Sequence, residues 1–150
     1  MTDALRQVPL INGPVEIRGA LEVVTTEAGV LPRRLPEWTI AQSDASMERQ
    51  ATAGSGVRLA FRTAATAIEL DVLTTVPMMA ENEPHPDDAG AFEITCDGSP
   101  VGAPRPAPVG NVLLMDLTMT QVGFVPGQPS TVRFEALPPG PKDVEIWLPH

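Results

Sequence analysis

Apolar and polar residues alternate with a period of two along several short segments, and this period is the main sequence signal of a β-strand. In residues 21–25, for example, Leu21, Val23 and Thr25 alternate with Glu22 and Val24. The first set is expected to face a core and the second to face water, as in antiparallel sheets that are wetted on one side. The same alternation predicts strands over residues 57–63, 67–73, 91–96, 131–136 and 143–148.

Short linkers between these segments predict three hairpins, which pair 57–63 with 67–73, 91–96 with a short strand at 99–102, and 131–136 with 143–148. The second of them contains Asp97-Gly98, a dipeptide typical of type I′ turns. The first would set outward arginines near outward carboxylates, a pairing worth roughly 0.2–1 kcal/mol for each cross-strand pair. The side chains concerned are Arg58, Arg62, Glu69 and Asp71.

Other segments do not read as regular strands. Pro36 and Glu37 suit the first turn of a helix, so a short helix is expected at 36–42. The apolar run 111–119 fits a strand or a helix, and we favour a strand. Residues 77–90 and 103–110 are rich in proline and are expected to be loops.

These elements predict an all-β fold, an antiparallel and jelly-roll-like β-sandwich with one short helix. The chain has 150 residues, which suits a single domain over 1–150. It contains 17 prolines and 12 glycines, which require many turns and short elements, as sandwiches have.

The net charge and the absence of apolar targeting segments limit the classes of partner that we expect. The net charge is −9 and Arg33-Arg34 is the only basic pair, whereas nucleic-acid binding needs a basic patch, so no nucleic-acid partner is expected. No apolar run is long enough to span a membrane, and the first residues lack the pattern of a signal peptide. We therefore expect a cytoplasmic protein without a membrane partner.

The sequence holds no complete catalytic or metal-binding motif. A hydrolytic triad needs a base, and the only histidines are His85, in an acidic proline-rich loop, and His150. No Gly-x-Ser-x-Gly elbow is present. The acidic run 81–88 lacks the spacing of a calcium loop, and Cys96 reads as a buried apolar residue. We predict no catalytic residue, metal site or cofactor, and an inactive chain.

The two tryptophans and the arginine pair are the candidate surface residues. Trp147 falls on the polar side of the strand at 143–148, where an exposed aromatic ring indicates a ligand or partner surface unless another element covers it. Trp38 reads either as part of that surface or, preferably, as the residue that packs the short helix onto the sheet. Arg33 and Arg34 are assigned to the same surface, with a solvated loop as the alternative.

Three stretches of the sequence are distinctive. They are Gly19-Ala20-Leu21-Glu22-Val23 followed by Leu31-Pro32-Arg33-Arg34-Leu35-Pro36-Glu37-Trp38, then Gly56-Val57-Arg58-Leu59-Ala60-Phe61-Arg62-Thr63-Ala64-Ala65-Thr66-Ala67-Ile68-Glu69-Leu70, and finally Val132-Arg133-Phe134 with Lys142-Asp143-Val144-Glu145-Ile146-Trp147-Leu148-Pro149-His150. Together they resemble the N-terminal domain of certain bacterial SGNH (GDSL-type) hydrolases. The likeness covers most of residues 19–76 and 131–150. It rests on whole segments rather than on a catalytic motif.

The resemblance implies a β-sandwich, similar to carbohydrate-binding modules, that precedes an α/β hydrolase domain in the same chain. The catalytic residues of that family would lie beyond His150, and none is carried over here. We therefore expect an accessory domain of an esterase or acyltransferase, with the catalytic domain as its partner in cis and a carbohydrate or acyl acceptor as ligand. The alternatives are a stand-alone carbohydrate-binding module and a structural domain that builds oligomers.

Overall fold

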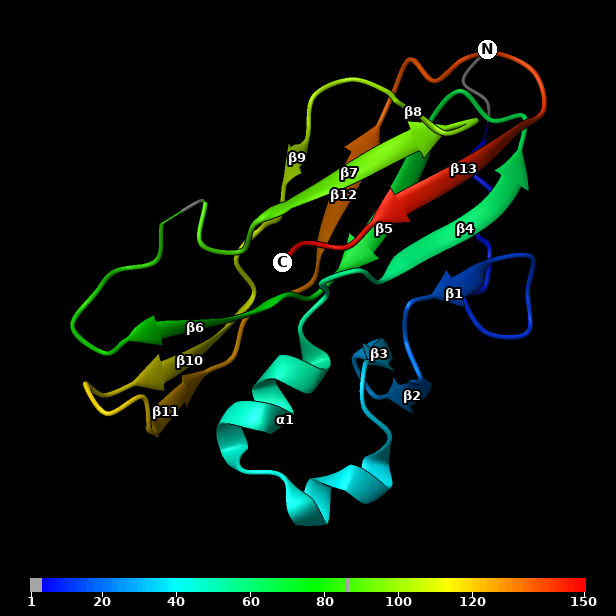
Figure 1. The fold of residues 1–150 in the computed structure, drawn as a ribbon. Helices are drawn as coiled ribbons and strands as arrows, with labels where there is room; N and C mark the ends of the chain where they lie inside the picture. The colour runs from blue at the N-terminus through cyan, green and yellow to red at the C-terminus, as the bar shows by residue number, and fades with distance from the viewer. Residues whose placement is uncertain (1–3, 86) are drawn as a thin grey trace.

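The computed structural model describes residues 4–85 and 87–150, which form short strands and two short helices (Figure 1). In chain order the elements are β1 (Glu16–Arg18), β2 (Glu22–Thr26), β3 (Gly29–Arg33), the 3₁₀ helix η1 (Glu37–Gln42), α1 (Ala45–Thr52), β4 (Arg58–Thr63), β5 (Ile68–Val72), β6 (Thr75–Met79), β7 (Ala91–Cys96), β8 (Ser99–Pro100), β9 (Arg105–Pro106), β10 (Asn111–Met115), β11 (Gln121–Val125), β12 (Ser130–Phe134) and β13 (Lys142–Trp147).

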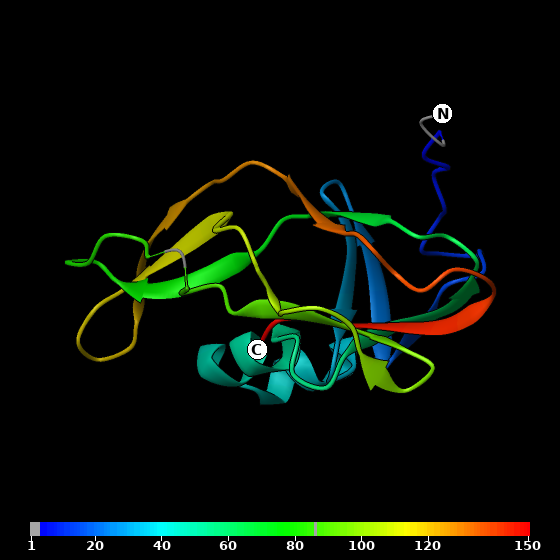
Figure 2. The same cartoon turned by 90° about the horizontal axis from the view of Figure 1, so that it is seen from above.

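Two layers enclose the core. The larger is a six-stranded sheet in the order β1-β4-β13-β7-β8, with β9 also paired to β7, and the smaller is the antiparallel pair β12-β5 (Figure 2). Ile146 and Ile94 from the large sheet pack with Phe134 from β12 in one buried cluster, against which Leu70 of β5 also packs. The prediction of an all-β, antiparallel, sandwich-like fold is confirmed.

Of the three predicted hairpins, the one at 91–102 is confirmed. β7 pairs with β8, and Cys96 lies opposite Ser99. Asp97 and Gly98 both have positive φ, 49° and 81°, as a type I′ turn requires.

The other two predicted hairpins are wrong, because the linkers cross from one layer to the other instead of turning back within a sheet. β4 pairs with β1 and β13, while β5 pairs with β12. The outward charges are still matched, but with different partners. Arg62 lies opposite Asp143, and Glu69 lies opposite Arg133.

Lys142 holds the first of these crossings. It is almost fully buried, and its Nζ donates to the carbonyl oxygens of Ala65, at 2.7 Å, and Gly140, at 3.3 Å. In addition, the backbone N–H of Leu137 donates to the carbonyl of Thr66. The two linkers between the layers are therefore tied to each other.

A separate three-stranded sheet extends to one side of the sandwich in the order β11-β10-β6 (Figure 1). β10 is antiparallel to β11 but parallel to β6. β10 occupies residues 111–115 of the strand expected at 111–119, and the remaining residues form the turn to β11. The predicted loop at 77–90 begins inside β6. The loop predicted at 103–110 contains the two-residue strand β9.

The N-terminal half differs from the sequence-based predictions in two places. In the β2-β3 ribbon, Leu21 is 73% exposed and Val23 is also exposed, whereas Glu22 and Val24 are partly buried, so the predicted faces of this segment are reversed. The helix expected at 36–42 is present as η1, but α1 was not predicted. Asp44 caps α1 by accepting a hydrogen bond from the N–H of Met47. Neither helix of the described residues has the length or apolarity to span a membrane.

Candidate functional site

The outer face of the six-stranded sheet carries a row of charged side chains beside an aromatic ring. Pairing places Arg58 on β4 directly opposite Trp147 on β13, and Trp147 opposite Glu93 on β7. One step along the strands, Ala60 lies between Glu16 on β1 and Glu145 on β13. Because side chains alternate across a strand, these residues all stand on the face that points away from the core.

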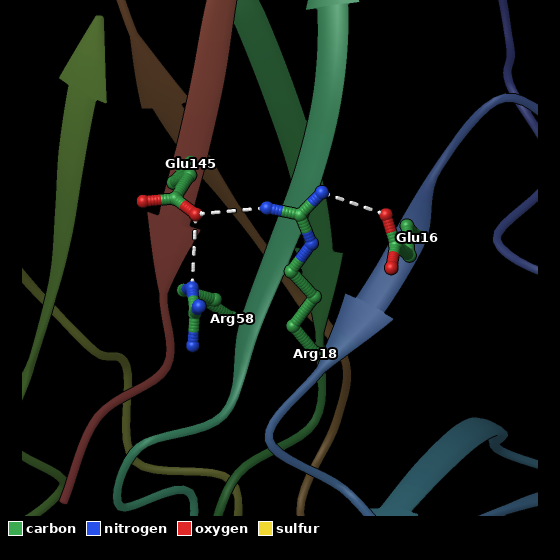
Figure 3. Close-up of polar contacts among 4 residues, drawn as sticks. All are labelled: Glu16, Arg18, Arg58 and Glu145. Atoms are coloured by element: carbon green, nitrogen blue, oxygen red, sulfur yellow. Dashed lines mark hydrogen bonds and ion pairs between the residues drawn. The ribbon is translucent and has the colours of Figure 1, made fainter. Parts of the chain in front are cut away.

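A small residue at the centre of this face lets charges on strands that are not neighbours meet. Arg18 reaches from β1 to Glu145 on β13, with 3.5 Å between Nη1 and Oε1 (Figure 3). Two strand spacings, about 9.6 Å, separate these strands. Ala60 lies between them and is itself buried, and a longer side chain at this position would stand in the path of the guanidinium.

Glu145 is shared by two arginines. Its Oε1 accepts from Nε of Arg58 at 2.9 Å and from Arg18, which also donates to Glu16 at 2.8 Å (Figure 3). The hydrogen bond and charge of Arg18 lower the pKa of the Glu16 carboxyl, and Glu16 in turn raises the pKa of Arg18. The pair of Arg18 and Glu16 therefore stays ionised through the neutral pH range.

Trp147 is only half-buried, and one face of its indole is covered. The guanidinium carbon of Arg58 lies 4.7 Å from the ring centroid, a cation–π contact. The alternative to an exposed ring was coverage by another element, and the structure places the side chain of Arg58 over one face of the ring. A sugar or other flat ligand has only the second face of the ring, beside Glu93, on which to stack.

The other predicted surface residues lie away from this face. Trp38 on η1 is 70% exposed, so the prediction that it packs the helix onto the sheet is wrong. Arg34 donates from Nε to the carbonyl of Gln50 at 3.2 Å, and its N–H bonds to the carbonyl of Ala51, so it caps the end of α1. The Arg33 side chain is 14% exposed and lies near Glu22. Arg34 therefore stabilises the end of α1. The surface role of Trp38, Arg33 and Arg34 stays a prediction.

The described residues do not bring together the groups of a catalytic or metal site. In residues 4–85 and 87–150, no hydroxyl or thiol hydrogen-bonds to His85 or His150, and no group of three His, Cys, Asp or Glu residues could hold a metal ion. Within the described part of the chain, the polar partners of His85 are Asp87 and Asp88. Burial raises the pKa of the Cys96 thiol, which keeps it protonated and unreactive.

Comparison with known proteins supplies one likeness. No family model matches the chain, and no curated protein sequence is similar to it. The fold is similar to that of a solved structure, the salicylyl-acyltransferase SsfX3 from a tetracycline biosynthetic pathway, with a TM-score of 0.69 and 20% sequence identity. The match covers 91% of this chain but 33% of that protein, so the chain spans about a third of its length. At this identity the likeness shows a shared fold.

Part of the outer-face network could be predicted from the sequence. The alternation placed Arg58 and Glu145 on outward positions, but their pairing could not be read from it. β1 was not predicted, although Val15-Glu16-Ile17-Arg18 alternates over four residues and could have indicated it. As a whole, the face carries carboxylates, guanidinium groups and a half-buried indole, which suits a polar ligand or a polar protein surface.

Proposed function

We propose that this domain is the accessory N-terminal part of an SGNH-type esterase or acyltransferase, and that it packs beside the catalytic domain and helps to shape its substrate site. One observation carries the proposal: nearly the whole chain matches the fold of about a third of an acyltransferase. The remaining two thirds of that protein are long enough for a separate domain. The segment resemblances at residues 19–76 and 131–150 favour the same family.

Trp147 is the residue through which we expect this domain to act on the substrate. Its ring stands beside Arg58 and Glu93 on the outer face, so an acyl acceptor could stack on the indole and hydrogen-bond to the charged groups. An aromatic anchor with polar neighbours is the usual composition of a small-molecule subsite. Trp38 is exposed on η1, and within residues 4–85 and 87–150 no charged side chain stacks on or hydrogen-bonds to its ring.

A stand-alone carbohydrate-binding module has less support. Binding by stacking needs an open aromatic surface, and Arg58 covers one face of Trp147. The chain has no tyrosine and only one other tryptophan, so a broad aromatic platform is not available.

The first test is the coding sequence that follows the codon of His150. We expect the frame to continue for roughly 200 residues, a common domain length, with a catalytic serine motif soon after this position. The longer protein should hydrolyse a p-nitrophenyl ester, and residues 1–150 alone should not. A stop codon at this point, or esterase activity in the isolated chain, would overturn the proposal.

The role of the outer face is tested in the longer protein with Trp147→Ala, and with Leu21→Ala, at an exposed apolar residue next to β2, as the control. The first change should lower kcat/KM for the acyl acceptor about tenfold, the equivalent of roughly 1.4 kcal/mol of lost contact. The control should leave it unchanged. A thermal unfolding curve for each variant separates loss of the subsite from loss of the fold. Equal kcat/KM values in folded Trp147→Ala and wild type would remove Trp147 from the substrate site.

A further inference from the structure

Asn12 and Gly13 form the one Asn-Gly dipeptide of the chain, and they lie in a bend shortly before β1. Both residues are exposed. Asn12 has a left-handed φ of 55°, a conformation that asparagine adopts more readily than most residues. In residues 4–85 and 87–150, no hydrogen bond involves the Asn12 side chain or the Gly13 N–H. The dipeptide is therefore open to water and is not restrained by hydrogen bonds.

The bend requires a glycine at position 13 because the main chain passes close to Pro9. A Cβ built on Gly13 would lie 2.4 Å from the carbonyl oxygen of Pro9 and 2.9 Å from Cγ of its ring. A residue with a side chain would push the two sides of the bend apart. The fold itself therefore keeps a glycine directly after an exposed asparagine.

The two residues carry the groups of an intramolecular reaction. When the Gly13 N–H loses its proton to hydroxide, the nitrogen attacks the side-chain carbonyl carbon of Asn12 and closes a five-membered ring. The bond from that carbon to Nδ2 breaks, and the nitrogen takes a proton from water and leaves as ammonia. Water then opens the resulting succinimide at either carbonyl, which gives aspartate or isoaspartate. Glycine favours the ring closure because it has no Cβ and rotates freely about its backbone bonds.

We propose that Asn12 is a site of spontaneous deamidation in the folded protein, with water as the co-reactant and isoaspartate among the products. The proposal does not depend on the proposed function. Asn82 gives the first contrast within the same chain, because it is also exposed but is followed by Glu83. The side chain of Glu83 hinders the attack of its own backbone nitrogen, so Asn82 should react more slowly than Asn12.

Asn111 is the third asparagine of the chain, and the fold protects it. Its Nδ2 donates to Oγ1 of Thr75 at 3.3 Å, and its Oδ1 accepts from the N–H of Gly127 at 2.9 Å. The next residue, Val112, is buried inside β10 and has a stiff β-branched side chain. We therefore expect the reaction rates to fall in the order Asn12, Asn82, Asn111.

Isoaspartate at this position would disturb the core, because it adds one carbon atom to the main chain within a tight bend. Leu10 before the bend and Val15 after it both pack against the buried cluster. Val15 leads directly into β1, which pairs with β4, whereas no described strand precedes the bend. The added length therefore displaces the N-terminal side of the bend, and Leu10 loses its place on the core.

The test incubates the 150-residue chain, folded and in urea, in mildly alkaline buffer at physiological temperature. Trypsin releases residues 7–18 as one peptide, and mass spectrometry follows the replacement of NH₂ by OH. In the folded chain, Asn12 should react at least about ten times as fast as Asn82, because Gly13 has no side chain. A methyltransferase specific for isoaspartyl carboxyl groups should label the same peptide. Asn12→Gln is the matched control, since glutamine would have to close a six-membered ring, and its peptide should stay unlabelled.

Three outcomes overturn the proposal. They are a rate at Asn12 no greater than that at Asn82, a reaction at Asn12 that occurs in urea but not in the folded chain, and equal labelling of wild type and Asn12→Gln. The effect on the core is measured on the aged chain by NMR. The methyl signals of Leu10 should shift while those of Ile146, deep in the core, stay in place. Unchanged Leu10 signals in the isoaspartyl form would contradict the displacement of this residue.

Discussion

Gly19 is a position at which a side chain would clash with the fold, and Gly98 provides the control. Both glycines have left-handed φ angles, 84° and 81°. A Cβ built on Gly19 would lie 2.1 Å from the carbonyl oxygen of Gly56, whereas a Cβ on Gly98 would meet nothing within 4 Å. The two alanine substitutions therefore share the same backbone strain and differ in the steric clash.

The strain common to both is about 1–2 kcal/mol, the cost of a left-handed conformation in a residue with a side chain. We expect Gly98→Ala to lower the free energy of unfolding by this amount. In Gly19→Ala, the linker between β1 and β2 must also move by roughly 1 Å away from Gly56, since real Cβ atoms do not approach an oxygen so closely. Displacement of packed backbone should add at least about 2 kcal/mol, by analogy with overpacked cores.

Urea unfolding of both variants, followed by circular dichroism, measures the difference directly. The m-values should match that of wild type, which shows that the unfolded states are comparable. A difference between the two variants smaller than about 0.5 kcal/mol, the usual error of additivity, would refute the reasoning, because it would mean that the approach of Gly19 to Gly56 is not required by the fold.

Further predictions concern the titrating and fluorescent groups. Arg18→Ala should raise the pKa of Glu16 toward its ordinary range, as measured by NMR titration. In wild type the folded-state pKa of Glu16 is lowered, so the stabilisation by this pair is present above the unfolded carboxyl pKa. It is lost as the pH falls through the folded-state pKa. Cys96 should react with a thiol reagent at pH 8 only as fast as the protein unfolds, because burial raises its pKa; rapid reaction in the folded protein would contradict this. Trp147→Phe, which leaves Trp38, should show stronger acrylamide quenching than Trp38→Phe, and the opposite order would mean that the exposures are reversed.

The strands of the sandwich were predictable, but their partners were not. The alternation at 57–63, 91–96, 131–136 and 143–148 identified strands because each buries one face against the same core. The period of two says nothing about which layer a strand joins. The linkers at 64–67 and 137–141 look like hairpin turns, yet each crosses between layers, and the inward Lys142 that ties them together is a tertiary feature.

The segments that the apolar–polar pattern failed to predict are those that bury few side chains. α1 has one buried residue, Ala51, so it lacks a strong helical stripe. β11 is apolar but exposed, and Leu21 and Val23 face outward on a two-stranded ribbon. The outer-face site was half predicted: alternation placed Trp147, Arg58 and Glu145 outward, whereas the contact with Arg18 required the pairing of β1 with β4.

The position of β13 in the large sheet has a consequence for the order in which the protein folds. β13 is the strand between β4 and β7, yet it comes last along the chain, so its pairs join residues as far apart as Arg58 and Trp147. During synthesis, the pair β1-β4 and the strands β7, β8 and β9 cannot join into one sheet until residues 142–147 leave the ribosome. Such non-local pairing is slow, and the half-made chain exposes strands that can associate wrongly. Production of this protein should therefore be more sensitive to chaperones and to temperature than its small size implies.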